Sequence, residues 1–349
     1  MQVAERVLSP LDAVRAALLR RLGRTAGWWS RSREDRVASM FAFGIVTSLT
    51  LAVLAPRWTL ALGPIVLGVP HVLADARYLV VRPGYHRRSA ILLAVLPPLA
   101  AGLWTADLAW AAVAMAAATL VARGPLLRKV VALAAAAALY AACAYFGRLS
   151  AIVFAHLHNF IAIGLWWSLR PRRRELFPLA LYVVACLAIA LGTLDFAFEA
   201  LRLPAIGTSL RGHGRDLAPA SFPADLAVRA AVFFAFAQSI HYVVWLRLIP
   251  EDGRERTAPR PFISTFRALM KDLGPWALAA FALGAAVILG WAFVDLADAR
   301  SGYLRMAVVH GHLELAALAL FFVEGVPTRA PGYGAPATGS EGRSETATT

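Results

Sequence analysis

Apolar residues run in long stretches along most of the chain, and short polar or charged clusters separate them. A helix needs about 20 mostly apolar residues to cross the hydrocarbon layer of a membrane, and ten stretches approach this length. They cover residues 37–56, 58–82, 89–106, 107–122, 128–147, 150–169, 176–194, 225–248, 275–298 and 302–325. The pattern therefore predicts an all-α fold, a polytopic transmembrane helical bundle of about ten spans.

The connections between these stretches differ in charge. Those that follow the second, fourth, sixth and eighth stretches are rich in arginine, such as Arg170 and Arg172 to Arg174, whereas the others carry little net positive charge. Because basic loops are retained in the cytoplasm, we predict that both termini are cytoplasmic. The expected location is the cell inner (plasma) membrane, crossed many times.

The two ends of the chain differ from the apolar middle. Residues 1–36 hold eight arginines in an amphipathic pattern and predict a cytoplasmic surface helix on anionic lipid. Residues 37–326 form the predicted transmembrane helical domain, and residues 327–349, rich in small and polar residues, predict a disordered tail. Two long connections, 195–224 outside and 249–274 inside, predict interfacial segments.

Composition supports the membrane class. The chain is 59% hydrophobic and only 16% charged, whereas about a quarter of a soluble domain is charged. The net charge of +14 follows the ends of the apolar stretches, so it indicates orientation and no nucleic-acid partner. Cys143 and Cys186 lie within apolar stretches and predict buried packing residues. The tryptophans near span ends predict interfacial anchors: Trp166, Trp167, Trp245 and Trp291.

Six of the eight histidines lie inside the apolar stretches, where an ionisable side chain is costly. The stretches that carry them are the second, sixth, eighth and tenth, which all run in the same direction, so their histidines fall at comparable depth. We therefore predict one metal site with the candidate ligands His71, His156, His158, His241, His310 and His312. His86 and His213 stand in loops beside arginines and are predicted to be solvated.

Two carboxylates share helix faces with these histidines. Asp75 follows His71 by four residues, and Glu314 follows His310 by four, so each can ligate the metal or orient an imidazole. Tyr78 continues the first of these faces and, with Tyr242, is a candidate pocket residue. The polar neighbours Asn159 and Gln238 are suited to supporting hydrogen bonds.

The members of each histidine pair, 156/158 and 310/312, point about 200° apart on a regular helix. Both members reach one metal only if the helix is distorted. Otherwise one member binds the metal, and the other packs elsewhere or binds a second ion.

Imidazole and carboxylate donors without thiolate suit iron, zinc or manganese. Chemistry on C–H or C=C bonds of lipids needs a redox metal and dioxygen, which favours non-haem iron in a mono- or dinuclear site. The HExxH signature of zinc hydrolases is absent, and so are the HxxxH and HxxHH boxes of membrane desaturases and alkane hydroxylases. Zinc and haem are therefore the less favoured cofactors.

The string from Gly68 to Asp75, GVPHVLAD, resembles the GxPHxxxD motif of the Brp/Blh family of membrane β-carotene dioxygenases. Residues 154–159, 239–242 and 309–312 follow in the order of that family's later histidine helices. Trp245 stands where the family has a second histidine on its third helix. The resemblance implies a multi-helix membrane protein that holds iron on intramembrane histidines and cleaves a carotenoid.

The hypothesis from the sequence is a membrane oxygenase that uses iron and dioxygen on an apolar lipid or isoprenoid entering from the bilayer. Two alternatives belong to other classes. One is a haem-binding electron-transfer protein with axial histidines, and the other is a proton- or ion-coupled transporter with histidine and glutamate as a relay.

Overall fold

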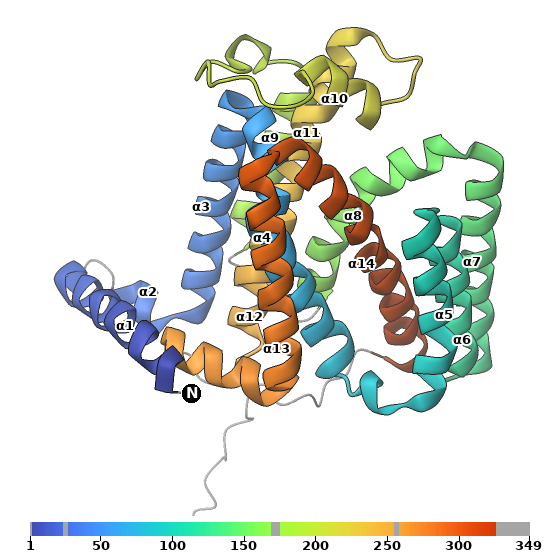
Figure 1. The fold of residues 1–349 in the computed structure, drawn as a ribbon, viewed down its shortest axis with the longest axis horizontal. Helices are drawn as coiled ribbons and strands as arrows, with labels where there is room; N and C mark the ends of the chain where they lie inside the picture. Colours follow the sequence, from blue (N-terminus) through green and yellow to red (C-terminus); the bar gives the residue numbers. More distant parts are fainter. Residues whose placement is uncertain (1, 24–26, 169–174, 255–257, 326–349) are drawn as a thin grey trace, which may run out of the picture.

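The computed structural model describes residues 2–23, 27–168, 175–254 and 258–325, and within these ranges the regular secondary structure is entirely helical. Most helices run roughly parallel or antiparallel in one bundle, while α1 lies obliquely at its side, near one end (Figure 1). The predicted all-α class is therefore confirmed. The predicted disordered tail, 327–349, lies outside the described residues.

Each of the ten predicted apolar stretches coincides with a helix. In chain order they are α3 (Arg33–Leu54), α4 (Pro56–Asp75), α5 (Ser89–Thr105), α6 (Ala109–Val121), α7 (Leu126–Phe146), α8 (Arg148–Ser168), α9 (Leu176–Ala190), α11 (Ala224–Val243), α13 (Phe262–Val294) and α14 (Leu296–Glu324). Seven of the described helices are long and apolar enough to cross a membrane, whereas α5, α6 and α9 are shorter apolar helices. The protein is thus a multi-pass membrane protein.

Two boundaries differ from the sequence prediction. Gly274, with φ 79° and ψ 167°, divides α13 into an amphipathic part before Pro275 and an apolar part after it. Helix α14 begins at Leu296, because the side chain of Asp295 caps it by accepting a hydrogen bond from the Asp298 backbone N–H. Arg300, which the charge pattern had placed in a connection, is consequently inside α14.

Helices α4 and α11 both continue as π-helix, as Ala76–Val81 (η2) and Val244–Leu248 (η5), the latter followed by α12 (Ile249–Asp252). A single 3-10 turn, η3 (Tyr85–Arg87), leads into α5. Isolated π turns in α-helices often occur at functional sites. Here both begin just after a histidine-bearing helix segment.

The N-terminal helix α1 (Gln2–Leu22) pairs with the amphipathic part of α13, and a short helix, α2 (Gly27–Arg31), leads into the bundle. Arg15 donates to the carbonyl of Arg260 at 2.6 Å, and Asp12 accepts from the backbone N–H of Phe262 at 2.7 Å. The apolar side chains of α1 remain exposed: Val7, Leu11, Val14, Leu18 and Leu22. The helix therefore has an apolar face that no described part of the chain covers.

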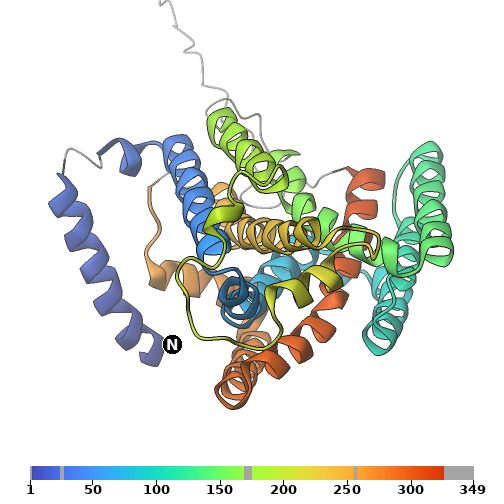
Figure 2. The ribbon, with the colours of Figure 1, turned by 90° about the horizontal axis from the view of Figure 1, so that it is seen from above.

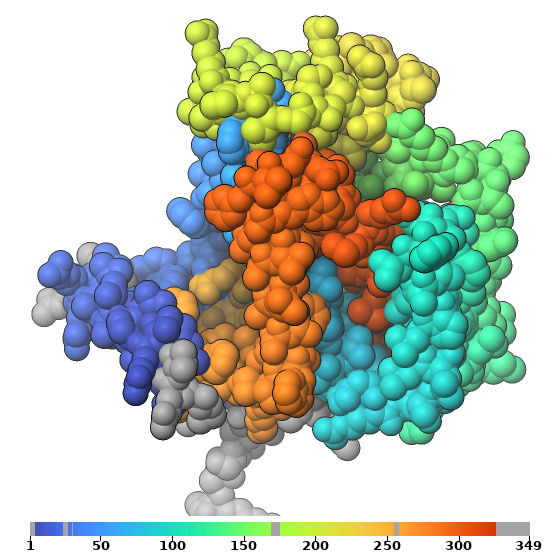
Figure 3. Space-filling model, viewed as in Figure 1, coloured from blue at the N-terminus to red at the C-terminus, as the bar shows by residue number. Residues whose placement is uncertain are grey.

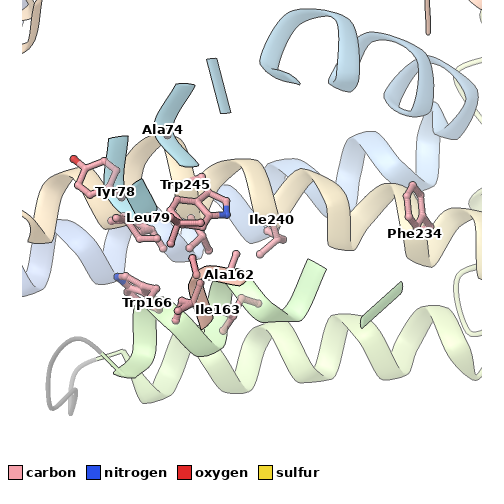
Figure 4. Close-up of a cluster of buried hydrophobic side chains, with 14 of the residues drawn as sticks. Ala74, Tyr78, Leu79, Ala162, Ile163, Trp166, Phe234, Ile240 and Trp245 are labelled. Atoms are coloured by element: carbon pink, nitrogen blue, oxygen red, sulfur yellow. The ribbon is translucent and has the colours of Figure 1, made fainter. Parts of the chain in front are cut away.

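Helix α11 passes through the middle of the bundle (Figure 2) and carries much of the core. Side chains of α4 with η2, α8, and α11 with η5 meet in one buried cluster (Figure 4). Trp166 and Trp245 belong to this cluster with 0% and 1% exposure, so the prediction that they anchor the protein at an interface is wrong. Trp166 donates its indole N–H to Asp252 at 2.7 Å.

Residues 195–223 form a cap over one end of the bundle (Figure 3), with the turn η4 (Asp195–Ala197) and the helix α10 (Leu210–Leu217). A Cβ on Gly214 would lie 2.7 Å from the Ala227 carbonyl oxygen, so α10 packs closely on α11. His213 is 8% exposed within this cap, which corrects the prediction that it is solvated. Its helix buries the ring against the bundle.

Candidate metal centre

Four histidines from four helices meet inside the bundle: His71 on α4, His158 on α8, His241 on α11 and His310 on α14. The Nε2 atoms of His71 and His241 are 2.8 Å apart, and those of His158 and His310 are 3.0 Å apart. The ring centroids of His71 and His310 are separated by 4.6 Å. These four residues, which we call the histidine cluster, confirm that the predicted histidine segments converge.

Two carboxylates adjoin the histidine cluster. An oxygen of Asp75 lies 3.3 Å from Nε2 of His71, and an oxygen of Glu314 lies 3.0 Å from Nδ1 of His158. Both side chains are fully buried, and none of their four oxygens makes a hydrogen bond. Among the described residues, no lysine or arginine forms an ion pair with either carboxylate. A buried carboxylate without such partners is costly unless it is neutral or bound to a cation.

The spacing of the donor atoms suits a metal ion. Two ligands held at about 2.1 Å and at right angles on one ion are about 3 Å apart, close to the two imidazole separations above. Three sets of donors lie within 4.8 Å of one another: His71 with His241 and His310, His158 with His241 and Glu314, and His71 with Asp75 and Glu314. The second set has two histidines and one carboxylate, the ligand combination typical of non-haem iron oxygenases.

The other two predicted ligands lie outside the cluster, because α8 and α14 are regular helices at these positions. His156 bonds through Nε2 to the carbonyl of Leu217 in the cap, at 2.9 Å, and its ring packs against Phe233 and Phe234. His312 is buried against α5, where a Cβ on Gly102 would overlap its ring. Each pair thus contributes one histidine to the cluster.

Local sequence allows the four helices to approach. A Cβ on Gly68 would overlap the ring of Tyr303, so the glycine lets α14 pack on α4 one turn before His71. A Cβ on Gly311 would lie 3.1 Å from Phe154, which brings α8 and α14 together beside His158.

A cavity of about 300 Å³ borders the histidine cluster. All four cluster histidines line it, together with Tyr242, Asn159 and Gln238, whereas Asp75 and Glu314 do not. Most of its remaining wall is apolar: Ala106, Leu108, Ala151, Phe154, Ala155, Leu217, Phe234, Leu304, Ala307, Val308 and Gly311. The carboxylates therefore lie behind the histidines as seen from the cavity.

The two predicted pocket tyrosines have different surroundings. The ring of Tyr242 lies on the cavity wall, 5.2 Å from the ring of His71. Tyr78, in contrast, lies in η2 and packs under the guanidinium groups of Arg77 and Arg82. The π-helical turn after Asp75 changes the side-chain register, so a pattern based on 3.6 residues per turn misplaces Tyr78.

Two further polar residues on the cavity wall were absent from the sequence prediction, namely Arg300 and Tyr303. Arg300 had been assigned to a connection, and tyrosine is common in membrane helices. The available signal was the helical spacing of Arg300, Tyr303, Ala307 and His310, which share one face of α14.

Comparison of the chain with known proteins finds no matching protein family, no matching curated protein and no matching solved structure.

Proposed function

We propose that the protein is an integral membrane non-haem iron oxygenase that acts on a lipid or isoprenoid substrate. The observation that carries this proposal is the buried set of His158, His241 and Glu314, two imidazoles and one carboxylate within 4.8 Å of one another. This combination holds iron with coordination positions left open in oxygenases. When bound, the iron would supply reaction with dioxygen and oxidation of a C–H or C=C bond.

The donors favour iron over ions that prefer sulfur. Cys143 packs near Leu108 and Ala111, and Cys186 interacts with Tyr182, so neither thiol belongs to the cluster. The histidine cluster and its two adjoining carboxylates together supply six donor groups, more than a single ion with open coordination positions requires. Two ions that share Glu314 would use five of these six donors and leave His310 beside them, because Glu314 belongs to two of the three donor groups.

The arrangement of residues supports a reaction on the cavity side. The cluster histidines form part of the cavity wall, and the carboxylates behind them provide the negative charge that a buried cation needs. Apolar side chains such as Phe154 and Phe234 line the same cavity. An apolar substrate held there would lie beside the metal-binding nitrogens.

The two alternative functions fit less well. A haem with two axial histidines needs its macrocycle between the imidazoles, whereas the two imidazole pairs have their Nε2 atoms at 2.8 and 3.0 Å. A proton relay would use the same histidines and carboxylates without a metal. The proton relay is the function that we would propose if no metal binds.

The proposed placement in the inner membrane has ten spans and both termini in the cytoplasm. Helix α1 and the connection from α4 to α5, which holds Arg87 and Arg88, lie toward the end of the bundle opposite the cap (Figure 1). The exposed apolar face of α1, beside eight arginines in residues 1–36, suits a helix resting on anionic lipid. The resemblance to the carotenoid dioxygenases remains a narrower proposal for the substrate.

The test is metal content by mass spectrometry with a visible spectrum, on protein purified in mild detergent without chelator. We expect one or two irons per chain and no Soret band. The iron-loaded protein, given dioxygen and a membrane lipid extract, should form oxygenated products that His241→Ala does not form. A Soret band would contradict the proposal, and so would the absence of bound iron after reconstitution, which would leave the proton relay.

A further inference from the structure

Arg300 places a cation on the wall of an otherwise mainly apolar cavity. Its Nε donates to the carbonyl of Leu60 at 2.7 Å, which ties α14 to α4 and fixes the side chain. Within the described part of the chain, no carboxylate lies at ion-pair distance from its guanidinium, and its two terminal nitrogens make no hydrogen bond. The terminal nitrogens are therefore free to bind a ligand.

Tyr303 adds a second donor one turn further along α14. It also lines the cavity, is 4% exposed, and its hydroxyl makes no hydrogen bond. Buried polar groups nearly always have a partner in folded proteins, so this hydroxyl, which packs beside Gly68 of α4, has an unused hydrogen-bonding capacity next to the cavity. The two residues share one helix face because they are three apart.

Arg300 and Tyr303 are on the same helix as His310, a residue of the histidine cluster. Ten residues of α14 separate Arg300 from His310, which corresponds to about 15 Å of helix. The wall between them is formed by Leu304, Ala307 and Val308. Along α14 the cavity wall thus carries a cation first, then apolar side chains, and then a histidine of the cluster.

We propose that Arg300 and Tyr303 bind the anionic oxygen group of an acidic lipid, either a carboxylate or a phosphate. Arginine is suited to this role because its planar guanidinium binds such groups with two parallel hydrogen bonds. The hydrocarbon of the lipid then extends along the apolar wall toward the histidine cluster. This inference rests on the proposed function and narrows its substrate to a lipid with an acidic end, in place of the hydrocarbon carotenoid that the resemblance implies.

The experiment measures binding to the full-length protein in neutral detergent by displacement of a fluorescent fatty acid. The competitors are hexadecanoate, hexadecanol, hexadecane and phosphatidylglycerol. Wild type should prefer hexadecanoate or phosphatidylglycerol to the alcohol and the hydrocarbon. Whichever of these two acidic lipids binds more tightly identifies the source of the anionic group.

Arg300→Gln should weaken binding of the preferred acidic lipid by roughly ten- to a hundredfold, since hydrogen bonds to charged groups are the strong ones. Its affinity for hexadecanol should stay the same. Tyr303→Phe, which removes only a hydroxyl, should cost roughly two- to tenfold. Arg300→Lys should restore part of the affinity. The matched control is Arg305→Gln, which removes the same charge from an exposed position of the same helix.

Iron content, measured on every variant, separates this inference from the proposed function. Variants that hold as much iron as wild type have an intact bundle, and their lipid affinities are then decisive. Equal affinity of wild type for the acid, the alcohol and the hydrocarbon would overturn the inference even if iron binds. The same holds if Arg305→Gln weakens binding as much as Arg300→Gln. If the wild-type protein holds no iron but still binds the acid through Arg300, the proposed oxygenase function would be overturned and the lipid-binding inference would stand.

Discussion

At the scale of single residues, the two histidines of each pair have different surroundings although they are only two positions apart on one helix. His158 lies in the histidine cluster, while His156 bonds to the cap through Leu217. On α14, His310 lies in the cluster, while His312 packs against α5 beside Gly102. Each pair therefore supplies its own control, since both members are imidazoles at nearly the same depth.

We predict that His158→Ala and His310→Ala lower the affinity for iron far more than His156→Ala and His312→Ala. Loss of even a supporting residue around a metal commonly costs about 10- to 100-fold in affinity, and loss of a ligand should cost at least as much. The measurement is iron per chain by mass spectrometry, with thermal unfolding in detergent to verify folding. Equal iron loss in both members of a pair would contradict the assignment of one ligand per pair.

At the scale of helices, the site depends on how closely α4 approaches α14. Gly68 provides this approach, because a Cβ there would overlap the ring of Tyr303. Gly63, five residues earlier on the same helix, is different, since a Cβ there would lie 3.6 Å from Tyr242, an ordinary contact. Comparison of alanine substitutions at the two glycines thus separates the effect of packing from that of helix propensity.

We predict that Gly68→Ala destabilises the protein by about 1–3 kcal/mol, the usual cost of overpacking. Gly63→Ala should instead be neutral or stabilising by up to about 1 kcal/mol, because alanine favours the helix. Thermal unfolding in neutral detergent measures both. A midpoint for Gly68→Ala at or above that of wild type would show that Tyr303 moves aside without cost.

The cap gives a second prediction at this scale. Burial, with the nearby cations of Arg300 and Arg57, lowers the pKa of His213 from 6.5 to about 4, although Asp216 opposes the shift. When the cap detaches, the ring takes up a proton near its ordinary pKa. The docked cap therefore keeps its full stability above about pH 6.5 and loses it progressively as the pH falls toward 4.

Hydrogen-exchange protection factors of residues 209–218 should thus be lower at pH 5 than at pH 7.5. In His213→Gln, which cannot be protonated in this range, the difference should shrink. Protection factors in wild type that do not change between the two pH values would contradict a neutral, buried His213.

At the scale of the whole molecule, the histidine cluster joins helices that are far apart in the sequence. His71 and His310 belong to the second and the last of the apolar helices and still lie in ring contact. Asp75 and Glu314 are buried beside them without a lysine or arginine partner in the described residues. A cation bound there would link four helices and relieve the cost of two buried charges.

We predict that iron stabilises the whole bundle. A ligand present at about 100 times its dissociation constant adds roughly 2.7 kcal/mol to the stability of the form that binds it. Chelation should therefore lower the midpoint of thermal unfolding, and added iron should restore it. His158→Ala is the control, because its midpoint should respond weakly to either treatment. A wild-type midpoint that is insensitive to iron would argue against a metal centre.

The helical class, the positions of the apolar helices and the candidate ligand histidines follow from the amino-acid sequence alone. Each of these rests on a one-dimensional pattern, since a run of apolar residues and a histidine within it are visible without knowledge of the neighbours. The spacings from His71 to Asp75 and from His310 to Glu314 are equally local, because residues four apart share a helix face.

Which histidine of each pair faces the other helices depends on the rotation of α8 and α14 about their axes, so it follows only from the packed bundle. The packed bundle also shows that Trp166 and Trp245 are core residues and that Tyr78 turns away from the cavity. Because Asp295 caps α14, Arg300 lies inside this helix, and its side chain lines the cavity. The physical reason is common to all of them: burial is set by neighbouring helices, and hydrophobicity does not specify which face each helix presents to the next.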